Sequence, residues 1–204
     1  MRLYLVRHGE TELNRQFRFI GRTDVGLSSI GREQAMTLAD RLKKEDITAV
    51  YSSNLRRAIQ TAETIAQPLS VAVKQIADLR EIDFGNWEGM TYDEIDMADH
   101  EHFHAWIADQ TVVPIPGGES WQHFEHRVKN AIMSVIMDER EGNIIVVSHG
   151  GPIKLLMTYF HGDDSEYFKS FWPSPGGLSI VEITGNTMNV LLENDISHGE
   201  GRND

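Results

Sequence analysis

The sequence predicts a three-layer α/β/α sandwich, in which helices flank a mainly parallel sheet and a small helical lid is inserted. Short runs rich in strand-forming residues alternate along the chain with segments whose apolar residues recur at helical spacing. The run 143–147 is continuously apolar, as expected of a strand that is covered on both faces. The length of 204 residues suits a single domain over 1–204.

The first part of the chain alternates strand and helix. Residues 2–6 are rich in strand formers and lead directly into Arg7-His8-Gly9, so this triplet should lie on the loop that leaves the first strand. Ser28 or Ser29 can cap the first long helix, and Pro68 should end the second. The predicted elements are strands at 2–6, 47–51 and 71–76 and helices at about 28–42 and 55–65.

Residues 81–119 have a different composition. This region carries Trp87, Trp106, several histidines and the turn-forming run Pro114-Ile115-Pro116-Gly117-Gly118. Such a mixture predicts short helices and loops rather than sheet. We therefore expect a lid insertion at approximately 86–118.

The last part of the chain returns to the alternating pattern. A long helix should run over 121–137 with Ser120 as its cap, and the buried strand 143–147 leads into Ser148-His149-Gly150-Gly151. The elements predicted after it are a helix at 152–160 and a hairpin of 178–183 and 187–192 around Gly185-Asn186. The polar end 198–204 is the part of the chain least expected to fold.

Composition excludes several classes of function. The net charge of -12 and the acidic pI argue against a nucleic-acid partner, so an anionic ligand would need a local group of basic residues. No cysteine is present, which excludes disulfides and thiolate catalysis and favours a cytoplasmic location. No apolar run is long enough for a membrane span or a secretory signal, so no membrane partner is expected. Composition makes no prediction of the oligomeric state.

Two histidines follow predicted strands at equivalent positions. His8 follows the first strand and His149 follows the buried strand, and ligands of parallel sheets bind at the carboxyl ends of the strands. The two side chains can therefore share one crevice. Imidazole is partly deprotonated near neutral pH and can act as a nucleophile, and arginine has the best-shaped side chain for phosphate. This combination suits a dianionic phosphate ester as substrate.

Six motifs in order resemble the histidine phosphatase superfamily, in its phosphoglycerate-mutase-like branch and of the broad-specificity phosphatase type. The first, Arg7-His8-Gly9-Glu10-Thr11-Glu12-Leu13-Asn14, is similar to the family signature Arg-His-Gly-x-Thr-x-x-Asn. Together the motifs span nearly the whole chain. The other five are Gly21-Arg22-Thr23-Asp24, Ser52-Ser53-Asn54-Leu55-Arg56-Arg57-Ala58, Leu79-Arg80-Glu81-Ile82-Asp83-Phe84-Gly85-Asn86-Trp87-Glu88-Gly89, Gly117-Gly118-Glu119-Ser120 and Ser148-His149-Gly150-Gly151.

The resemblance implies a fold, an activity and roles for individual residues. It implies a phosphoglycerate-mutase-like fold and a phosphatase that hydrolyses phosphate monoesters of small molecules without metal or other cofactor. His8 would accept the phosphoryl group and Glu81 would donate the proton to the leaving group. The family spacing places its arginine directly before an alanine, which selects Arg57 over Arg56. The remaining implied roles are phosphoryl binding by Arg7, Arg57 and His149 and substrate binding by Asn14, Thr23 and Arg22.

Two rival functions share much of this pattern. A phosphoglycerate-type mutase would use the same histidine but exclude water, whereas the segment from Ile82 to Gly117 is shorter than the corresponding insertion in typical cofactor-dependent mutases. A short lid should admit water, which favours hydrolysis. A non-catalytic domain that binds phosphate or a partner protein is the second rival, and the presence of every expected catalytic residue argues against it.

Several residues have simpler interpretations that stay open. Glu88, Asp83 and Asp78 lie close to Glu81 in sequence and could replace it as the acid. His100 and His104 have helical i, i+4 spacing suited to a metal, but a solvated lid face is the preferred interpretation. The aromatic residues that could line a pocket for an apolar leaving group, although core packing is favoured for most of them, are Trp87, Phe103, Trp106 and Trp121.

Overall fold

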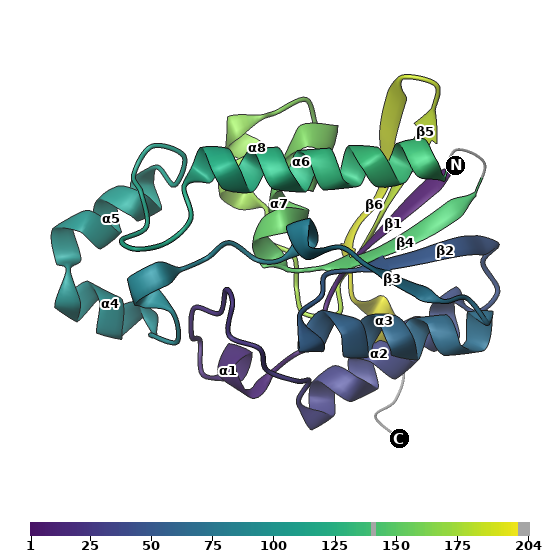
Figure 1. Ribbon diagram of the computed structural model, residues 1–204, viewed down its shortest axis with the longest axis horizontal. Coiled ribbons are helices and arrows are strands. Elements are labelled where there is room, and N and C mark those ends of the chain that lie inside the picture. The colour runs from purple at the N-terminus through teal and green to yellow at the C-terminus, as the bar shows by residue number, and fades with distance from the viewer. Residues whose placement is uncertain (140–141, 200–204) are drawn as a thin grey trace.

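The computed structural model describes residues 1–139 and 142–199, and a six-stranded sheet lies at its centre (Figure 1). The strand order is β3-β2-β4-β1-β5-β6. Strands β3, β2, β4 and β1 are parallel, whereas β5 and β6 continue the sheet in antiparallel pairing. The strands are β1 (Arg2–Arg7), β2 (Ile47–Ser52), β3 (Val73–Gln75), β4 (Asn143–Ser148), β5 (Leu178–Thr184) and β6 (Thr187–Asp195).

Helices cover both faces of the sheet, which confirms the predicted sandwich (Figure 1). On one face, α2 (Ser29–Leu42) and α3 (Arg56–Leu69) pack on Tyr4 and Val6 of β1. On the other, α6 (Trp121–Asp138) and α7 (Gly150–Phe160) pack on Leu3 and Leu5. Successive strand residues point to opposite faces, so a strand in this position must be apolar at every residue. The continuous apolar run of β4 has this cause.

Local sequence sets the ends of the long helices. The Ser28 side chain caps α2 by accepting a hydrogen bond from the Gly31 amide, and Ser120 caps α6 in the same way. Pro68 does not end α3 as predicted: it lies inside the last turn, and the helix continues to Leu69. Ser70, with φ of 57°, ends it in the left-handed conformation.

Between η2 (Gly85–Trp87) and Gly118 the chain forms two short helices beyond one end of the sheet (Figure 1). These are α4 (Tyr92–Ala98) and α5 (His100–Ala108). They are held by aromatic side chains rather than by sheet pairing: the rings of Trp87 and Trp106 lie 5.2 Å apart, and Phe103 stacks on Trp106. The prediction of short helices and loops is confirmed.

The remaining elements are short. They are α1 (Glu12–Arg15), η1 (Ala77–Leu79), α8 (Ser165–Ser170) and η3 (Ser197–Gly199). Of the polar end expected not to fold, 198–199 belong to η3 and 200–204 lie outside the described residues. No helix within 1–139 or 142–199 has the length and apolar character needed to cross a membrane.

Candidate active site

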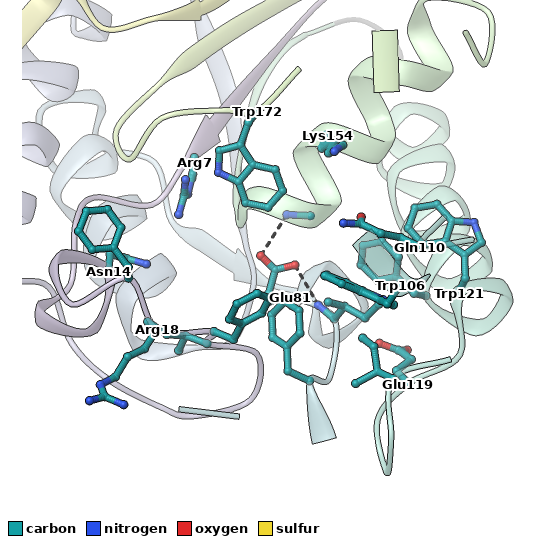
Figure 2. A pocket seen from close by; sticks show the side chains of 18 of the residues that line it. Arg7, Asn14, Arg18, Glu81, Trp106, Gln110, Glu119, Trp121, Lys154 and Trp172 are labelled. Atoms are coloured by element: carbon teal, nitrogen blue, oxygen red, sulfur yellow. Dashed lines mark hydrogen bonds between the residues drawn. The ribbon is translucent and has the colours of Figure 1, made fainter. Parts of the chain in front are cut away.

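A cavity of about 320 Å³ lies next to the carboxyl ends of β1 and β4 (Figure 2). Strands β1 and β4 are neighbours, and Arg7 of one is paired with Ser148 of the other, so His8 and His149 follow side by side. The residues from the sequence prediction that line the cavity are Arg7, His8, Asn14, Arg57 and Glu81.

The hydrogen bonds of His8 fix its tautomer. Nδ1 lies 2.7 Å from the Gly9 carbonyl oxygen, which can only accept, so Nδ1 carries the hydrogen. Nε2 lies 3.2 Å from Nε of Arg57, which can only donate, so Nε2 keeps its lone pair. Burial, with the charges of Arg57 and Arg7, holds the pKa of His8 well below its usual value. The imidazole is thus neutral, with its hydrogen on Nδ1 and its lone pair on Nε2.

Arg57 links the two histidines. Its side chain is 1% exposed, and Nε also donates to Nδ1 of His149 at 3.2 Å. The terminal nitrogens donate to the carbonyls of Gly21 and Thr23 at 2.9 and 2.8 Å. These backbone contacts fix the guanidinium beside His8.

His149 lies beside His8 but does not line the cavity. Its ring centre is 5.0 Å from that of His8, and Nε2 lies 2.8 Å from the Ser53 hydroxyl oxygen. Burial and the charge of Arg57 hold the pKa of His149 well below its usual value. In this structure His149 therefore supports His8 and Arg57.

Among the described residues, Arg7 has a buried donor without a partner. Its Nη1 donates to the carbonyl of Pro173 at 2.7 Å, whereas the buried Nε has no hydrogen-bond partner among the described residues. Burial lowers the pKa of Arg7 to about 10, so the group is still charged at neutral pH. A buried N–H without an acceptor is costly, and an anion in the cavity is suited to supply one.

Two carboxyl groups line the cavity, and their surroundings differ. Glu81 accepts backbone hydrogen bonds from Gly151 and Ile82, both of 3.0 Å, yet burial raises its pKa (Figure 2). Burial also acts to raise the pKa of Glu119, but the guanidinium of Arg127, bound through both carboxylate oxygens at 2.7 Å, lowers it. The two carboxyl groups thus differ in the direction of their pKa shifts, upward for Glu81 and downward for Glu119.

The alternative acids in this part of the sequence have other partners. Glu88 accepts hydrogen bonds from the amides of Gly21 and Thr23, so it holds the loop whose carbonyls bind Arg57. Asp83 pairs with Arg22 at 2.8 Å, and Asp78 is exposed.

The predicted substrate-binding residues divide into two groups. Asn14 lines the cavity, and its Oδ1 accepts hydrogen bonds from Thr11. Thr23 and Arg22 do not line it. Thr23 instead contributes the carbonyl that holds Arg57, and Arg22 contributes the ion pair with Asp83.

The histidines of α5 lie on an exposed face. His100 and His104 both contact Oδ1 of Asp96, at 2.8 and 2.9 Å, and the three side chains could offer ligand atoms within 4.8 Å of one another. None of the three lines the cavity. The expectation that this is a solvated face without a metal stays a prediction.

The aromatic residues expected near the site divide between pocket and core. Trp106 and Trp121 line the cavity, whereas Trp87 and Phe103 are buried within the aromatic cluster. Sequence reasoning missed Lys154, Gln110 and Trp172, which also line it. Lys154 could have been noticed, because it lies little more than one helical turn after His149.

Comparisons with known proteins agree with this geometry. A bifunctional protein of Mycobacterium tuberculosis is 41% identical over 157 residues, which are 76% of this chain and 43% of that protein, so the chain spans less than half of this relative. Phosphoserine phosphatase 1 of Hydrogenobacter thermophilus is 33% identical over 197 residues, 97% of this chain and 93% of that protein. The solved structure of Bacillus stearothermophilus YhfR matches with a TM-score of 0.90 and 34% identity, over 97% of this chain and 98% of that one.

The family model of the histidine phosphatase superfamily (branch 1) matches residues 3–196. The match covers both strand ends that carry His8 and His149, as well as Arg57 and Glu81. The chain belongs to the histidine phosphatase superfamily.

Proposed function

We propose that the protein hydrolyses phosphate monoesters of small molecules through a phosphohistidine on Nε2 of His8. The observation that carries the proposal is the unprotonated Nε2 of His8, which accepts a hydrogen bond from Arg57, in a cavity that is also lined by Arg7 and by a carboxyl group of raised pKa. Nucleophile, anion-binding groups and acid are thus in one place.

In the first step, Nε2 attacks phosphorus in line with the ester oxygen. The P–N bond forms as the P–O bond breaks, and the carboxyl group of Glu81 gives its proton to the departing oxygen. Arg57 and the unpartnered Nε of Arg7 would bind the phosphoryl oxygens. The alcohol leaves, and Glu81 is now ionised.

In the second step, water attacks the phosphorus of phosphohistidine. Glu81 takes the proton of the water, the P–N bond breaks, and its electron pair returns to Nε2. Inorganic phosphate leaves and the starting protonation state is restored. Because the two arginines supply the positive charge, this scheme needs no metal.

The volume of the cavity favours small substrates. A volume of about 320 Å³ is at the small end of the range for ligand pockets. We propose that the 86–118 segment acts as the lid of this single domain, since Trp106, Gln110, Val113 and Ile115 line the cavity. The similarity to a phosphoserine phosphatase also supports a small phosphate ester as substrate. A cytoplasmic location stays a prediction of the sequence.

The test is release of phosphate by chelator-treated protein from p-nitrophenyl phosphate and a panel of phosphorylated metabolites. We expect the wild type to release phosphate and His8→Ala to release none above background, because the variant has no nucleophile. His126→Ala, at an exposed position of α6, is the matched control and should behave as the wild type.

Two results would contradict the proposal. Equal rates of phosphate release by His8→Ala and the wild type would exclude a phosphohistidine intermediate on His8. Movement of a phosphoryl group between positions of a phosphoglycerate without release of phosphate would instead support a mutase.

A further inference from the structure

Lys154 is a buried cation in the wall of the cavity. It belongs to α7 and is 8% exposed. Among the described residues its Nζ has no ion pair or hydrogen bond. Its contacts are aromatic: Nζ lies 4.1 Å from the ring centre of Phe168 and 5.3 Å from that of Trp172.

Such a side chain is unusual because a buried charge is normally paired with an anion. Aromatic faces stabilise a cation only in part. Burial lowers the pKa of Lys154, and no neighbouring carboxylate offsets it. The two carboxyl groups that line the same cavity bind elsewhere, Glu81 to backbone amides and Glu119 to Arg127. Within 1–139 and 142–199, no carboxylate therefore neutralises the positive charge that Lys154 brings to the cavity.

Lys154 is also separate from the phosphoryl-binding groups. In Figure 2 the indole of Trp172 lies between Lys154 and Arg7, and the guanidinium carbon of Arg7 is 5.9 Å from the same ring centre. Arg7 lies beside the proposed phosphoryl site, whereas Lys154 lies across the indole from it. A phosphoryl group on His8 would therefore leave Lys154 free for the other end of the substrate.

We propose that Lys154 binds a second anionic group, a carboxylate, on the leaving group of the substrate, and so determines specificity. This inference rests on the proposed phosphatase activity. The substrate class is a phosphate monoester whose alcohol carries one acidic group. The spacer between the two anions would lie against the aromatic wall that includes Trp172 and Phe168.

The test compares esters that differ only in this charge. The 3- and 4-carboxyphenyl phosphates are paired with the corresponding carbamoylphenyl phosphates, which have nearly the same shape and no carboxylate. For each pair we measure the ratio of kcat/KM, carboxylate over carboxamide. In Lys154→Met this ratio should fall about tenfold or more relative to the wild type for the better-fitting isomer, chiefly through KM, since a charge-assisted contact is lost.

Three further variants make the result specific. Lys154→Arg should recover part of the ratio, and Lys154→Gln replaces Lys154→Met if the latter does not fold. Lys129→Met is the matched control: Lys129 pairs with Glu125 and Asp163 outside the cavity, and its loss should leave the ratio unchanged.

The outcomes separate the two proposals. If, for each isomer, the carboxylate-to-carboxamide ratio of kcat/KM is the same in Lys154→Met as in the wild type, Lys154 does not bind a second anion and the phosphatase proposal stands. If the wild type hydrolyses p-nitrophenyl phosphate but none of the four esters, the inferred substrate class is wrong and the phosphatase stands. If it releases phosphate neither from these esters nor from p-nitrophenyl phosphate and the panel of metabolites, the phosphatase proposal fails and this inference fails with it.

Discussion

Glu81 and Glu119 show how surroundings divide two chemically identical residues. Both line the cavity and both are buried. The guanidinium of Arg127 donates two hydrogen bonds to the Glu119 carboxylate, which favours the ionised form and occupies both of its oxygens. In the part of the chain that the structure describes, the Glu81 carboxyl group accepts hydrogen bonds from backbone amides alone, and burial raises its pKa. A carboxyl that holds a proton at higher pH can deliver it to a leaving group.

A substitution of Glu81 should depend on the leaving group. Glu81→Gln keeps the size of the side chain but cannot donate an acidic proton. For benzyl phosphate we expect kcat/KM to fall by roughly 10²–10⁴, the usual contribution of a general acid. For p-nitrophenyl phosphate the loss should be far smaller, because nitrophenolate leaves without a proton. An equal loss on both esters would assign Glu81 a different role, and Glu12→Gln, at an exposed position of α1, is the control.

The pH profile of the wild type gives a second measurement of the same group. Only the protonated carboxyl can donate, so kcat/KM for benzyl phosphate should fall as the pH rises through the pKa of Glu81. Because burial raises that pKa, the fall should begin above the range of an ordinary glutamate. This fall in kcat/KM at higher pH should be absent from the profile of Glu81→Gln. If it persists in the variant, the titrating group is not Glu81.

At the scale of elements, the start of α7 positions the carboxyl group of Glu81, the proposed acid. Gly151 lies in the first turn of this helix, and its amide donates to Glu81. The first amides of a helix have no partner within the helix, so an external carboxyl group satisfies one of them. A Cβ on Gly151 would lie 2.3 Å from Oε1 of Glu81, too close for both atoms to keep their places. Glycine is therefore required here for space.

Gly151→Ala should displace the acid and leave the fold intact. The atom in conflict is the end of a side chain, which can rotate away, and alanine suits a helix better than glycine. We expect kcat/KM for benzyl phosphate to fall at least tenfold with much less effect on p-nitrophenyl phosphate, as a weakened general acid implies. The melting temperature should stay within a few degrees of the wild type. Gly199→Ala is the control, because a Cβ at Gly199 meets nothing within 4 Å. Wild-type rates for Gly151→Ala would contradict the role of Gly151 in positioning Glu81.

The sequence predicted elements better than it predicted contacts between them. Strand β4, helix α7 and the caps Ser28 and Ser120 follow from local patterns, and the structure confirms them. Pro68 was placed one residue too early as a helix end, because a proline near the end of a helix can be accommodated in the last turn. The clamp of loop carbonyls around Arg57 could not be predicted, since any residue can supply a carbonyl.

The whole molecule brings together a site that no single segment contains. Strands β1 and β4 are far apart in the chain, and only their pairing places His8 beside His149. The strand patterns predicted that both histidines follow strands and can share one crevice, but the direct pairing of these two strands depends on the topology of the sheet. Trp172 could not be predicted for the same reason, because its place in the cavity wall depends on how distant segments pack together. For Lys154 the sequence offers one signal, its position little more than one helical turn after His149.

Burial of His8 and His149 next to two arginines has a cost for stability that depends on pH. Burial and neighbouring positive charge hold the pKa of both imidazoles well below the usual value of 6.5 in the folded protein. Below pH 6.5 the unfolded chain therefore binds protons that the folded protein does not bind, and unfolding becomes more favourable. Stability from this source is present above pH 6.5 and is lost as the pH falls.

Urea unfolding measures this loss at pH 7.0 and 5.5. Two histidines that stay neutral in the folded state should each lower the free energy of unfolding by about 1 kcal/mol over this range. His149→Gln retains an acceptor and a donor but cannot be protonated, so its stability should fall by about 1 kcal/mol less than that of the wild type over the same interval. His126→Gln, at an exposed position of α6, should show the wild-type dependence. If His149→Gln loses as much stability as the wild type, then His149 takes up a proton in the folded protein as readily as in the unfolded chain, and the neutral pair beside Arg57 is wrong.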